Sequence, residues 1–328
     1  MIIKIIGAGA WGTTMARLLA QDDSNKVYLW CNEVETCENI NRDNENSEFL
    51  SGIKLPKNII AYNEIKKTFE EELCVIAVPS QFFEDIINRL NIHKEASFLI
   101  LTKGMRKDGR FLSDIISEIF SESSFAFLSG PNLAKEIADH QPASAVIAGV
   151  DIELTKKIQK LLFREYFRVY TSTDYKGLQI GGMYKNILAI GAGICDAMGF
   201  GLNTKAAYLT RGLMEMTRFG SELDCEPFTF MGLSGVGDLI ATANSDLSRN
   251  YSFGRRIVDE KKGPLNIYNS SKQAIEGVEA IKVVVEGFKD VKVQLPIASV
   301  LYEIIFKGMP FEKGVNILLN REPKKEIY

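Results

Sequence analysis

Length, composition and charge limit the classes of protein to consider. The chain has 328 residues, of which 46% are hydrophobic and 25% charged, and its formal net charge is −3. A single core rarely grows beyond about 250–300 residues, so two domains are expected in a chain of this ordinary globular composition. The slight negative charge excludes a generally basic surface for nucleic acid or anionic membranes, and an anionic substrate must be bound by a local cluster.

The first elements in chain order predict a dinucleotide-binding unit. Residues 2–6 (IIKII) form a short β-branched run, and the GxGxxG motif of Gly7, Gly9 and Gly12 opens a helical pattern before a second strand at 26–30. This strand–loop–helix–strand order is the context that the dinucleotide fingerprint requires. The three glycines permit, in turn, the tight turn, the approach of backbone to pyrophosphate and close helix–strand packing. The helix N-terminus would stabilise the pyrophosphate charge.

Asn32 and Glu33 follow the second strand, where the adenosine ribose is normally recognised. An acidic residue there accepts from the ribose 2′-hydroxyl, whereas a basic residue accommodates a 2′-phosphate. No Arg or Lys is adjacent. Glu33 favours NAD slightly and Asn32 is neutral, so the choice between NAD and NADP stays open.

The rest of the first half predicts an open α/β sheet. Residues 34–72 are polar and are expected to form an exposed helix and loop. Apolar runs predict further strands at 72–80, 97–105, 123–132, 143–149 and 167–173. A Rossmann-type domain is therefore expected over residues 1–178. Lys103 follows one strand, where it is either a solvated loop residue or a contact for a substrate anion or carbonyl.

The second half changes to helical periodicity, which predicts an all-helical domain over residues 179–328. Its first helix, at 181–201, contains glycines that each cost about 1 kcal/mol relative to alanine, which makes sense if another backbone approaches closely. Lys185 and Asp196 lie on one stripe of this helix and suggest a buried ion pair. Further helices are expected at 204–223, 270–284 and 295–306, the last followed by a charged tail.

Two other groups of polar residues stand out in this half. Arg211, Glu215 and Arg218 have the i, i+4, i+7 spacing of an intrahelical charge network. The tandem Ser248-Arg249-Asn250 offers hydrogen-bond donors that suit a phosphate, although a helix cap explains the serine and the asparagine equally well.

Cysteine and histidine usage argues against a metal site. The five cysteines show no CxxC pair and are interpreted as reduced thiols of a cytoplasmic protein. His93 and His140 are too few for a multi-histidine site, and both are interpreted as exposed loop residues. The glycine spacing near the N-terminus argues against a signal peptide, and no apolar run reaches the ~18 residues of a membrane span.

Together, these motifs resemble the bacterial NAD(P)-dependent glycerol-3-phosphate dehydrogenases over nearly the whole chain. The similarity rests on GAGAWGT (7–13), VPS (78–80), TKG (102–104), SGPNLAKE (129–136), the helix at 181–201, LTRGLMEM (209–216), FMGLSGVGDLIAT (230–242) and SRNYSFG (248–254).

The resemblance implies a role for individual residues. Lys185 matches the proton acceptor for the substrate hydroxyl, and Lys103 matches a lysine that contacts both substrate and cofactor. The substrate-binding positions matched are Lys103, Gly130, Asn132, Lys185, Asp238, Ser248, Arg249 and Asn250. Besides the three glycines of the motif, the cofactor-binding positions matched are Ala10, Trp11, Asn32, Lys103, Ala134, Arg249 and Glu276. The family usually has Ser or Thr in place of Asn132, often Ser in place of Ala10, and often His or Arg in place of Asn32.

The implied reaction is reversible hydride transfer between NAD(P)H and dihydroxyacetone phosphate, giving sn-glycerol 3-phosphate for phospholipid synthesis. Burial and Lys103 would favour neutral Lys185 as the general base, whereas Asp196 or Asp238 would oppose that shift. The resemblance also implies a homodimer. Two alternatives remain: a reductase of another small hydroxy acid, and a nucleotide sensor without catalysis.

Overall fold

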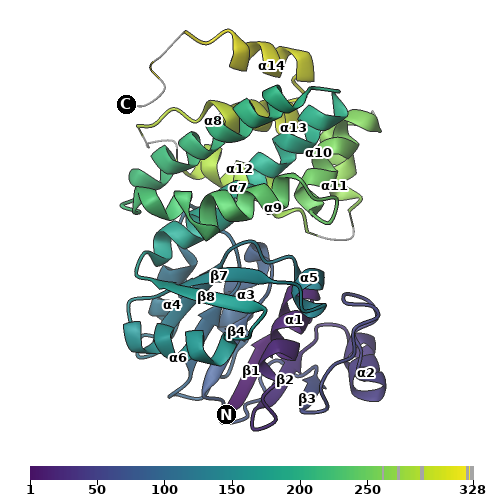
Figure 1. The fold of residues 1–328 in the computed structure, drawn as a ribbon, viewed down its shortest axis with the longest axis vertical. Helices are drawn as coiled ribbons and strands as arrows, with labels where there is room; N and C mark the ends of the chain where they lie inside the picture. The colour runs from purple at the N-terminus through teal and green to yellow at the C-terminus, as the bar shows by residue number, and fades with distance from the viewer. Residues whose placement is uncertain (261, 272–273, 289–291, 323–324, 326–328) are drawn as a thin grey trace.

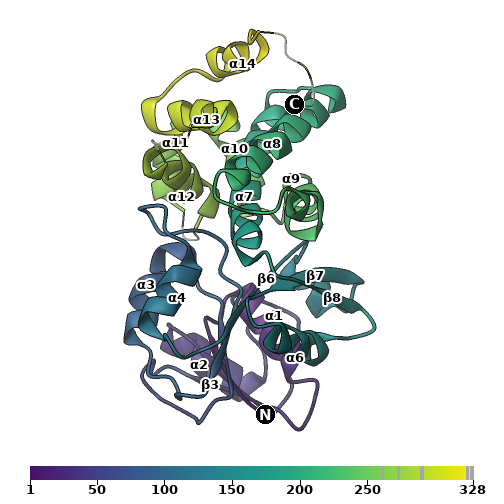
Figure 2. The ribbon, with the colours of Figure 1, turned by 90° about the vertical axis from the view of Figure 1, so that its left-hand side faces the viewer.

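The computed structural model describes residues 1–328 except 261, 272–273, 289–291, 323–324 and 326–328. Figure 1 shows a sheet flanked by helices in the N-terminal half and a stack of helices in the C-terminal half. Helix α7 (Tyr175–Ala197) rises from the sheet into the helical part, as a second view shows (Figure 2). The domain boundary predicted at 178/179 lies in the first turn of this helix.

Among the described residues, eight strands form one sheet in the order β3-β2-β1-β4-β5-β6-β7-β8. Their bounds are β1 Ile2–Ile6, β2 Lys26–Trp30, β3 Ile59–Tyr62, β4 Leu73–Ile76, β5 Ser97–Ile100, β6 Phe125–Ser129, β7 Ala143–Ala148 and β8 Phe167–Ser172. Neighbouring strands are parallel except for β6 and β7, which are antiparallel. The chain leaves β1 first toward β2 and later returns on its other side as β4. A ligand crevice is therefore expected beyond the carboxyl ends of these two strands.

Amphipathic helices cover both faces of the sheet. Met15, Ile40 and Ile158, from α1, α2 and α6, belong to the core on one face. Phe83 and Ile115, from α3 and α4, belong to the core on the other face. The bounds are α1 Ala10–Leu19, α2 Val34–Asp43, α3 Ser80–Arg89, α4 Leu112–Ile119, α5 Ala134–Ala138 and α6 Ile152–Leu162.

The helical part is built around α7, which is buried without a break from Gly177 to Cys195. A helix that is apolar on all sides is expected to be surrounded by others, and α7 contacts α8, α9, α10, α12 and α13. The other described helices are α8 Leu202–Ser221, α9 Asp238–Ala243, α10 Arg249–Asp259, α11 Pro264–Asn269, α12 Glu276–Lys282, α13 Pro296–Lys307 and α14 Phe311–Leu319. Short 3-10 and π-helical segments lie at Pro227–Met231, Leu233–Gly237 and Val283–Gly287.

The predicted α/β sheet followed by a helical part is confirmed, with two local corrections. The segment 34–72 contains α2 but also β3, a strand of four residues that the surrounding polar sequence concealed. The helix predicted at 270–284 begins only at Glu276, because Ser270 is instead the C-cap of α11. Residues 272–273 of that prediction, and residues 323–324 and 326–328 of the charged tail, lie outside the described part.

The glycines of α7 allow another helix to approach, as the sequence suggested. A Cβ at Gly193 would lie 2.1 Å from the carbonyl oxygen of Tyr251, and a Cβ at Gly254 would lie 2.0 Å from that of Ile190. Helices α7 and α10 therefore cross with backbone against backbone. A side chain at either glycine cannot be accommodated without moving one helix.

The predicted pairing of Lys185 with Asp196 is wrong. Asp196 accepts hydrogen bonds from Lys205 Nζ and Tyr251 Oη, each at 2.6 Å. Eleven residues of α-helix rise by about 16 Å, so two side chains at this spacing share a stripe but cannot touch.

The predicted charge network around Glu215 is also wrong. Glu215 is buried, and its carboxylate accepts from Tyr184 Oη at 2.8 Å and from the amides of Ile297 and Ala298 at 2.9 Å. It therefore ties the buried faces of α7 and α8 to the start of α13. Among the described residues it forms no ion pair with the arginines of its own helix.

Tyr208→Phe is expected to stabilise the protein. The Tyr208 hydroxyl is enclosed above Gly191 and has no hydrogen-bond partner among the described residues. Removing a buried, unpaired hydroxyl should raise the free energy of unfolding by about 1 kcal/mol, measured by urea denaturation. Tyr184→Phe is the matched control, because it removes a hydroxyl that donates to Glu215 and should lower stability. A loss of stability in Tyr208→Phe would contradict this reasoning.

Candidate active site

The glycine motif after β1 forms a cradle at the predicted crevice. Gly7 has φ +112°, and a Cβ there would lie 2.6 Å from the carbonyl oxygen of Ala77. A Cβ at Gly12 would lie 1.9 Å from the carbonyl oxygen of Gly7, whereas the space beside Gly9 is open for 4 Å among the described residues. Gly9 is also the N-cap of α1, so no side chain at this position caps the first amides of the helix. The open approach and the uncapped helix amides fit a pyrophosphate, so the residues present fit a dinucleotide.

Four other residues predicted for the cofactor, Ala10, Trp11, Asn32 and Ala134, lie on elements next to this cradle. Ala10 and Trp11 form the first turn of α1, and Ala134 begins α5, where its carbonyl oxygen accepts from Thr14 Oγ1 at 3.1 Å. Asn32 and Glu33 are exposed at the end of β2, and the Asn32 amide donates to the Glu33 carboxylate at 3.1 Å. These residues extend from the phosphate cradle to the expected ribose position.

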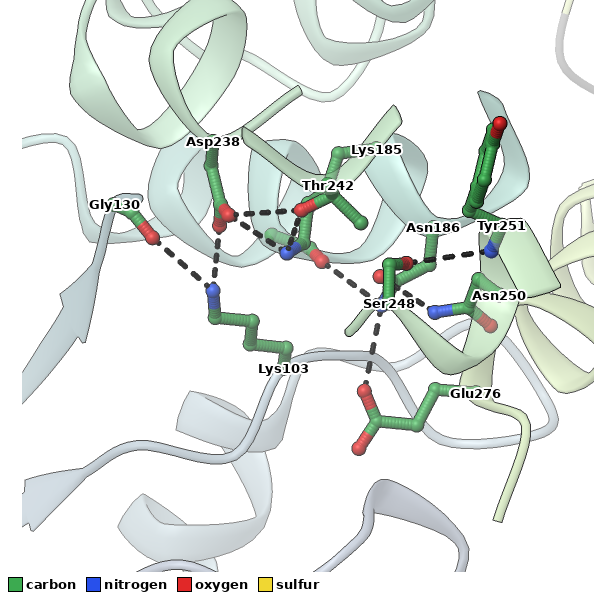
Figure 3. A network of polar contacts seen from close by, with 11 residues as sticks. Lys103, Gly130, Lys185, Asn186, Asp238, Thr242, Ser248, Asn250, Tyr251 and Glu276 are labelled. Carbon is green, nitrogen blue, oxygen red and sulfur yellow. Dashed lines mark hydrogen bonds and ion pairs between the residues drawn. The ribbon is translucent and has the colours of Figure 1, made fainter. Parts of the chain in front are cut away.

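Two lysines and one aspartate form the centre of the site (Figure 3). Asp238, at the start of α9, accepts from Lys103 Nζ at 2.5 Å through one carboxylate oxygen and from Lys185 Nζ at 2.7 Å through the other. Lys103 also donates to the carbonyl oxygen of Gly130 at 3.4 Å, and Lys185 donates to Thr242 Oγ1 at 2.6 Å. Residues from the sheet domain and from the helical part thus meet at one carboxylate.

The electrostatics of this centre lower the pKa of Lys185 toward physiological pH. Burial lowers the pKa of Lys185 to about 8, with Lys103 adding to the shift and the Asp238 carboxylate opposing it. Burial alone would raise the pKa of Asp238, but Lys103 and Lys185 together hold it below its usual range. Asp238 is therefore a fixed negative charge, and Lys185 can gain or lose a proton near physiological pH.

Unpaired polar atoms lie at the end of β6 and shortly after it. Gly130 has φ +140°, which turns the chain so that its carbonyl oxygen reaches Lys103. Both carboxamide atoms of Asn132 and the hydroxyl of Ser129 are enclosed and have no partner among the described residues. Buried polar groups normally have hydrogen-bond partners, so these atoms are suited to contact a bound substrate or cofactor.

The Ser248-Arg249-Asn250 cluster lies at the start of α10. Ser248 is the N-cap of this helix and accepts from the amide of Tyr251 at 3.3 Å, so the cap interpretation of that serine is confirmed. Arg249 is exposed, whereas Asn250 is buried and donates to Asn186 Oδ1 at 2.9 Å. Asn186 in turn donates to Glu276 Oε2 at 3.3 Å, which places the predicted Glu276 beside the same cluster (Figure 3).

Family models match both parts of the chain. The family model "NAD-dependent glycerol-3-phosphate dehydrogenase N-terminus" matches residues 2–155, and the corresponding C-terminus model matches residues 174–316. The chain belongs to this family. The glycerol-3-phosphate dehydrogenase [NAD(P)+] of Carboxydothermus hydrogenoformans is 37% identical over 99% of this chain and 98% of its own length. That of Alcanivorax borkumensis is 37% identical over 98% and 95%.

Solved structures of glycerol-3-phosphate dehydrogenases from other organisms have the same fold as this chain. The enzyme of Coxiella burnetii superposes with a TM-score of 0.90 and 30% identity, covering 98% of this chain and 99% of that one. The glycerol-3-phosphate dehydrogenase of Saccharomyces cerevisiae gives 0.80 and 26%, covering 97% and 99%. The family resemblance, the oxidoreductase class and the NAD(P) cofactor predicted from the sequence are confirmed.

Three polar residues of this family member's site were not assigned a role from the sequence. Thr242 holds Lys185 and donates to Asp238 Oδ1 at 3.2 Å, and its i+4 spacing from Asp238 was the signal that could have revealed it. Asn186, next to Lys185, connects Asn250 to Glu276. Ser129, only 3% exposed, had no distinguishing sequence signal beyond preceding Gly130.

Two further properties concern the described residues of the chain. No group of His, Cys, Asp or Glu among them is arranged to hold a metal ion, and the five cysteines are free and buried. No helix in the described part is both long enough and apolar enough to cross a membrane.

Proposed function

We propose that the protein catalyses the reversible NAD(P)-dependent oxidation of sn-glycerol 3-phosphate to dihydroxyacetone phosphate. The observation that carries the proposal is the Lys103–Asp238–Lys185 centre in a chain of this family. Lys103 follows β5 and the glycine cradle follows β1, so both lie at the carboxyl edge of the same parallel strands. When bound, the nicotinamide supplies the hydride chemistry. The protein supplies position, charge and a place for the proton.

Lys185 acts as the general base for the C2 hydroxyl. A neutral amine has two N–H donors and one lone pair. The two donors are occupied by Asp238 and Thr242, and the Thr242 hydroxyl is fixed as an acceptor because it donates its own proton to Asp238. The lone pair therefore remains for the proton that leaves the hydroxyl as C2 loses its hydride and the carbonyl forms. In the reverse reaction the ammonium returns this proton.

Lys103 stabilises the substrate oxygen. It uses two N–H groups for Asp238 and Gly130, and its third can donate to the alkoxide or carbonyl oxygen at C2. Gly130 and Asn132 complete the wall on this side. The enclosed carboxamide of Asn132 provides unused donors and acceptors for the substrate.

The substrate phosphate binds at the start of α10. Arg249 is exposed there, and Ser248 and Asn250 flank it. A guanidinium with adjacent polar side chains suits a phosphate dianion. Binding energy from the phosphate then fixes C2 against the nicotinamide, as remote binding groups do in other enzymes. A phosphate-free hydroxy acid would lack this contact.

The glycine cradle from Gly7 to Gly12 would hold the cofactor. Asn32 would contact its adenosine ribose end, and Ala134 and Glu276 would contact the part nearer the two lysines. Because Glu33 would repel a 2′-phosphate, we expect NADH to react faster than NADPH.

The test of function is absorbance at the nicotinamide band with purified protein, dihydroxyacetone phosphate, and NADH or NADPH in separate cuvettes. We expect oxidation that requires the phosphosubstrate. Faster turnover of a phosphate-free 2-oxo acid would instead favour the hydroxy-acid reductase. Nucleotide binding without any turnover would favour the sensor.

The pH dependence follows from the lowered pKa of Lys185. Oxidation of glycerol 3-phosphate needs the neutral amine, so kcat/KM should rise about tenfold per pH unit below about 8 and level off above it. Reduction of dihydroxyacetone phosphate needs the ammonium, so its rate should fall as pH rises above about 8. Initial rates in both directions check this, and profiles that bend in the same direction would contradict it.

The proposed function includes a cellular role for the reaction and a division of labour along the chain. In the reductive direction the reaction would supply glycerol 3-phosphate for phospholipid synthesis in the cytoplasm, in keeping with five free thiols. The chain would divide functionally into residues 1–178 for the dinucleotide and 179–328 for substrate and catalysis.

A homodimer is proposed because the helical part exposes large apolar side chains. Phe228 is 86% exposed and the nearby Met231 is 45% exposed. Sedimentation equilibrium should show a dimer that Phe228→Asp weakens. Val150→Asp is the control, since Val150 is 73% exposed on the sheet domain and should leave the dimer intact. A monomeric wild type would contradict the proposal.

A further inference from the structure

Three hydrogen bonds link four groups beside the lysine centre in a row, here named the amide chain. The backbone amide of Gly277 donates to Asn250 Oδ1 at 2.8 Å, and Asn250 Nδ2 donates to Asn186 Oδ1 at 2.9 Å. Asn186 Nδ2 then donates to Glu276 Oε2 at 3.3 Å. Because Glu276 and Gly277 are consecutive, the chain leaves α12 at a backbone amide and returns to it at the preceding side chain.

The direction of the amide chain is fixed by its two ends. A backbone N–H can only donate, and an ionised carboxylate can only accept. Both carboxamides are therefore held in one orientation, with oxygen toward Gly277 and nitrogen toward Glu276. Reversing either one would place oxygen against oxygen or nitrogen against nitrogen.

The packing around the amide chain leaves it little freedom. Asn186 and Asn250 are 3% and 7% exposed, and they come from α7 and α10, the two helices that cross with backbone contact. A Cβ at Gly277 would lie 2.6 Å from the Asn186 carbonyl oxygen and 2.9 Å from Asn250 Oδ1. Glu276 is only partly buried, and Figure 3 shows its carboxylate directed toward the sheet-domain side of the site.

We propose that Asn250 and Asn186 are positioning residues that orient the Glu276 carboxylate for a hydroxyl-bearing part of the dinucleotide. The proposal rests on the proposed function, in which Glu276 contacts the cofactor. It gives Asn250 an effect on dinucleotide affinity that does not depend on the substrate. A residue that only binds the phosphate of the substrate would have no such effect.

Asn250→Asp breaks the amide chain with almost no change in shape. The new carboxylate still accepts from Gly277, but its second oxygen then faces Asn186 Oδ1. If the Asn186 carboxamide turns over to donate to Asp, its oxygen faces the Glu276 carboxylate instead. The first arrangement sets two oxygens against each other beside Asn186, and the second takes the donor away from Glu276, so either one disturbs the orientation of the Glu276 carboxylate. Asn250→Leu breaks the chain without adding charge.

The experiment is a fluorescence titration of NADH binding to the full-length protein without substrate. Glu276→Ala, Asn250→Asp and Asn250→Leu should each weaken binding by about 10-fold, as the loss of one hydrogen bond to a charged group predicts. The double variant Asn250→Leu/Glu276→Ala should bind within about twofold of Glu276→Ala alone, because residues that act through one contact are not additive. Asn244→Asp, an exposed residue after α9, adds the same charge and should leave NADH affinity unchanged.

Two results would overturn the proposal. One is unchanged NADH affinity in both Asn250 variants, with loss confined to the KM for dihydroxyacetone phosphate. The other is a double variant whose loss is the product of the two single losses, which would show that Asn250 does not act through Glu276. Far-UV circular dichroism checks that each variant is folded. If only one Asn250 variant folds, its NADH affinity alone tests the proposal. Since the titration needs no turnover, it stands even if the proposed reaction fails.

Discussion

Lys185→Met should lower kcat by about 10²–10⁴-fold in both directions while leaving NADH affinity close to that of the wild type. The methionine keeps the volume of the side chain but can neither accept the C2 hydroxyl proton nor return it. Asp238 keeps its ion pair with Lys103 in this variant, so no unpaired charge is left in the site. Steady-state rates and a fluorescence titration of NADH measure the two expectations separately.

Lys205→Met is a closely matched control. Lys205 and Lys185 are both 8% exposed, and each donates to an aspartate, at 2.6 and 2.7 Å respectively. Lys205 pairs with Asp196 at the far end of α7, away from the lysine centre. Its replacement should lower stability but leave kcat within about threefold, since a structural ion pair contributes to folding rather than chemistry. Equal losses of kcat in both variants would show that Lys185 acts through stability alone.

Local patterns were sufficient for most strands of the sheet and for the cofactor cradle. Strands such as Ile2–Ile6 and Lys26–Trp30 are short runs of apolar and β-branched residues, and the structure has them with the predicted bounds. The glycine cradle needs only its own spacing and its flanking elements. Strand β3 could not be predicted in this way, because the sequence around Ile59–Tyr62 is polar. This strand is stabilised by its pairing with β2.

The pairing of the buried charges could not be predicted in the same way. Lys185 is bound by Asp238, 53 residues later in the chain, and by Thr242, both of which arrive through the packing of α9 against α7. A stripe along one helix shows which side chains share a face, but not which other element covers it. The family resemblance gave Lys185 and Asp238 as separate site positions, without their contact.

Gly193→Ala should be the most destabilising of the substitutions considered, with a loss of about 3 kcal/mol or more. Its Cβ would lie 2.1 Å from the carbonyl oxygen of Tyr251 and 3.0 Å from the amide nitrogen of Arg255. Overpacking against side chains typically costs about 1–3 kcal/mol because rotamers can adjust, but here the obstructing atoms belong to backbone. The helices can separate only if α10 moves as a unit.

That movement couples stability to the site, since α10 carries Ser248, Arg249 and Asn250 at its first turn. Gly193→Ala should therefore raise the KM for dihydroxyacetone phosphate even under conditions where the variant is folded. Gly201→Ala is the control: Gly201 has no atom within 4 Å of its Cβ position among the described residues, and it is the N-cap of α8. Its replacement should cost about 1 kcal/mol or less, the usual range for a cap. Urea denaturation compares the two variants, and equal losses would mean that α7 and α10 do not depend on a glycine at their crossing.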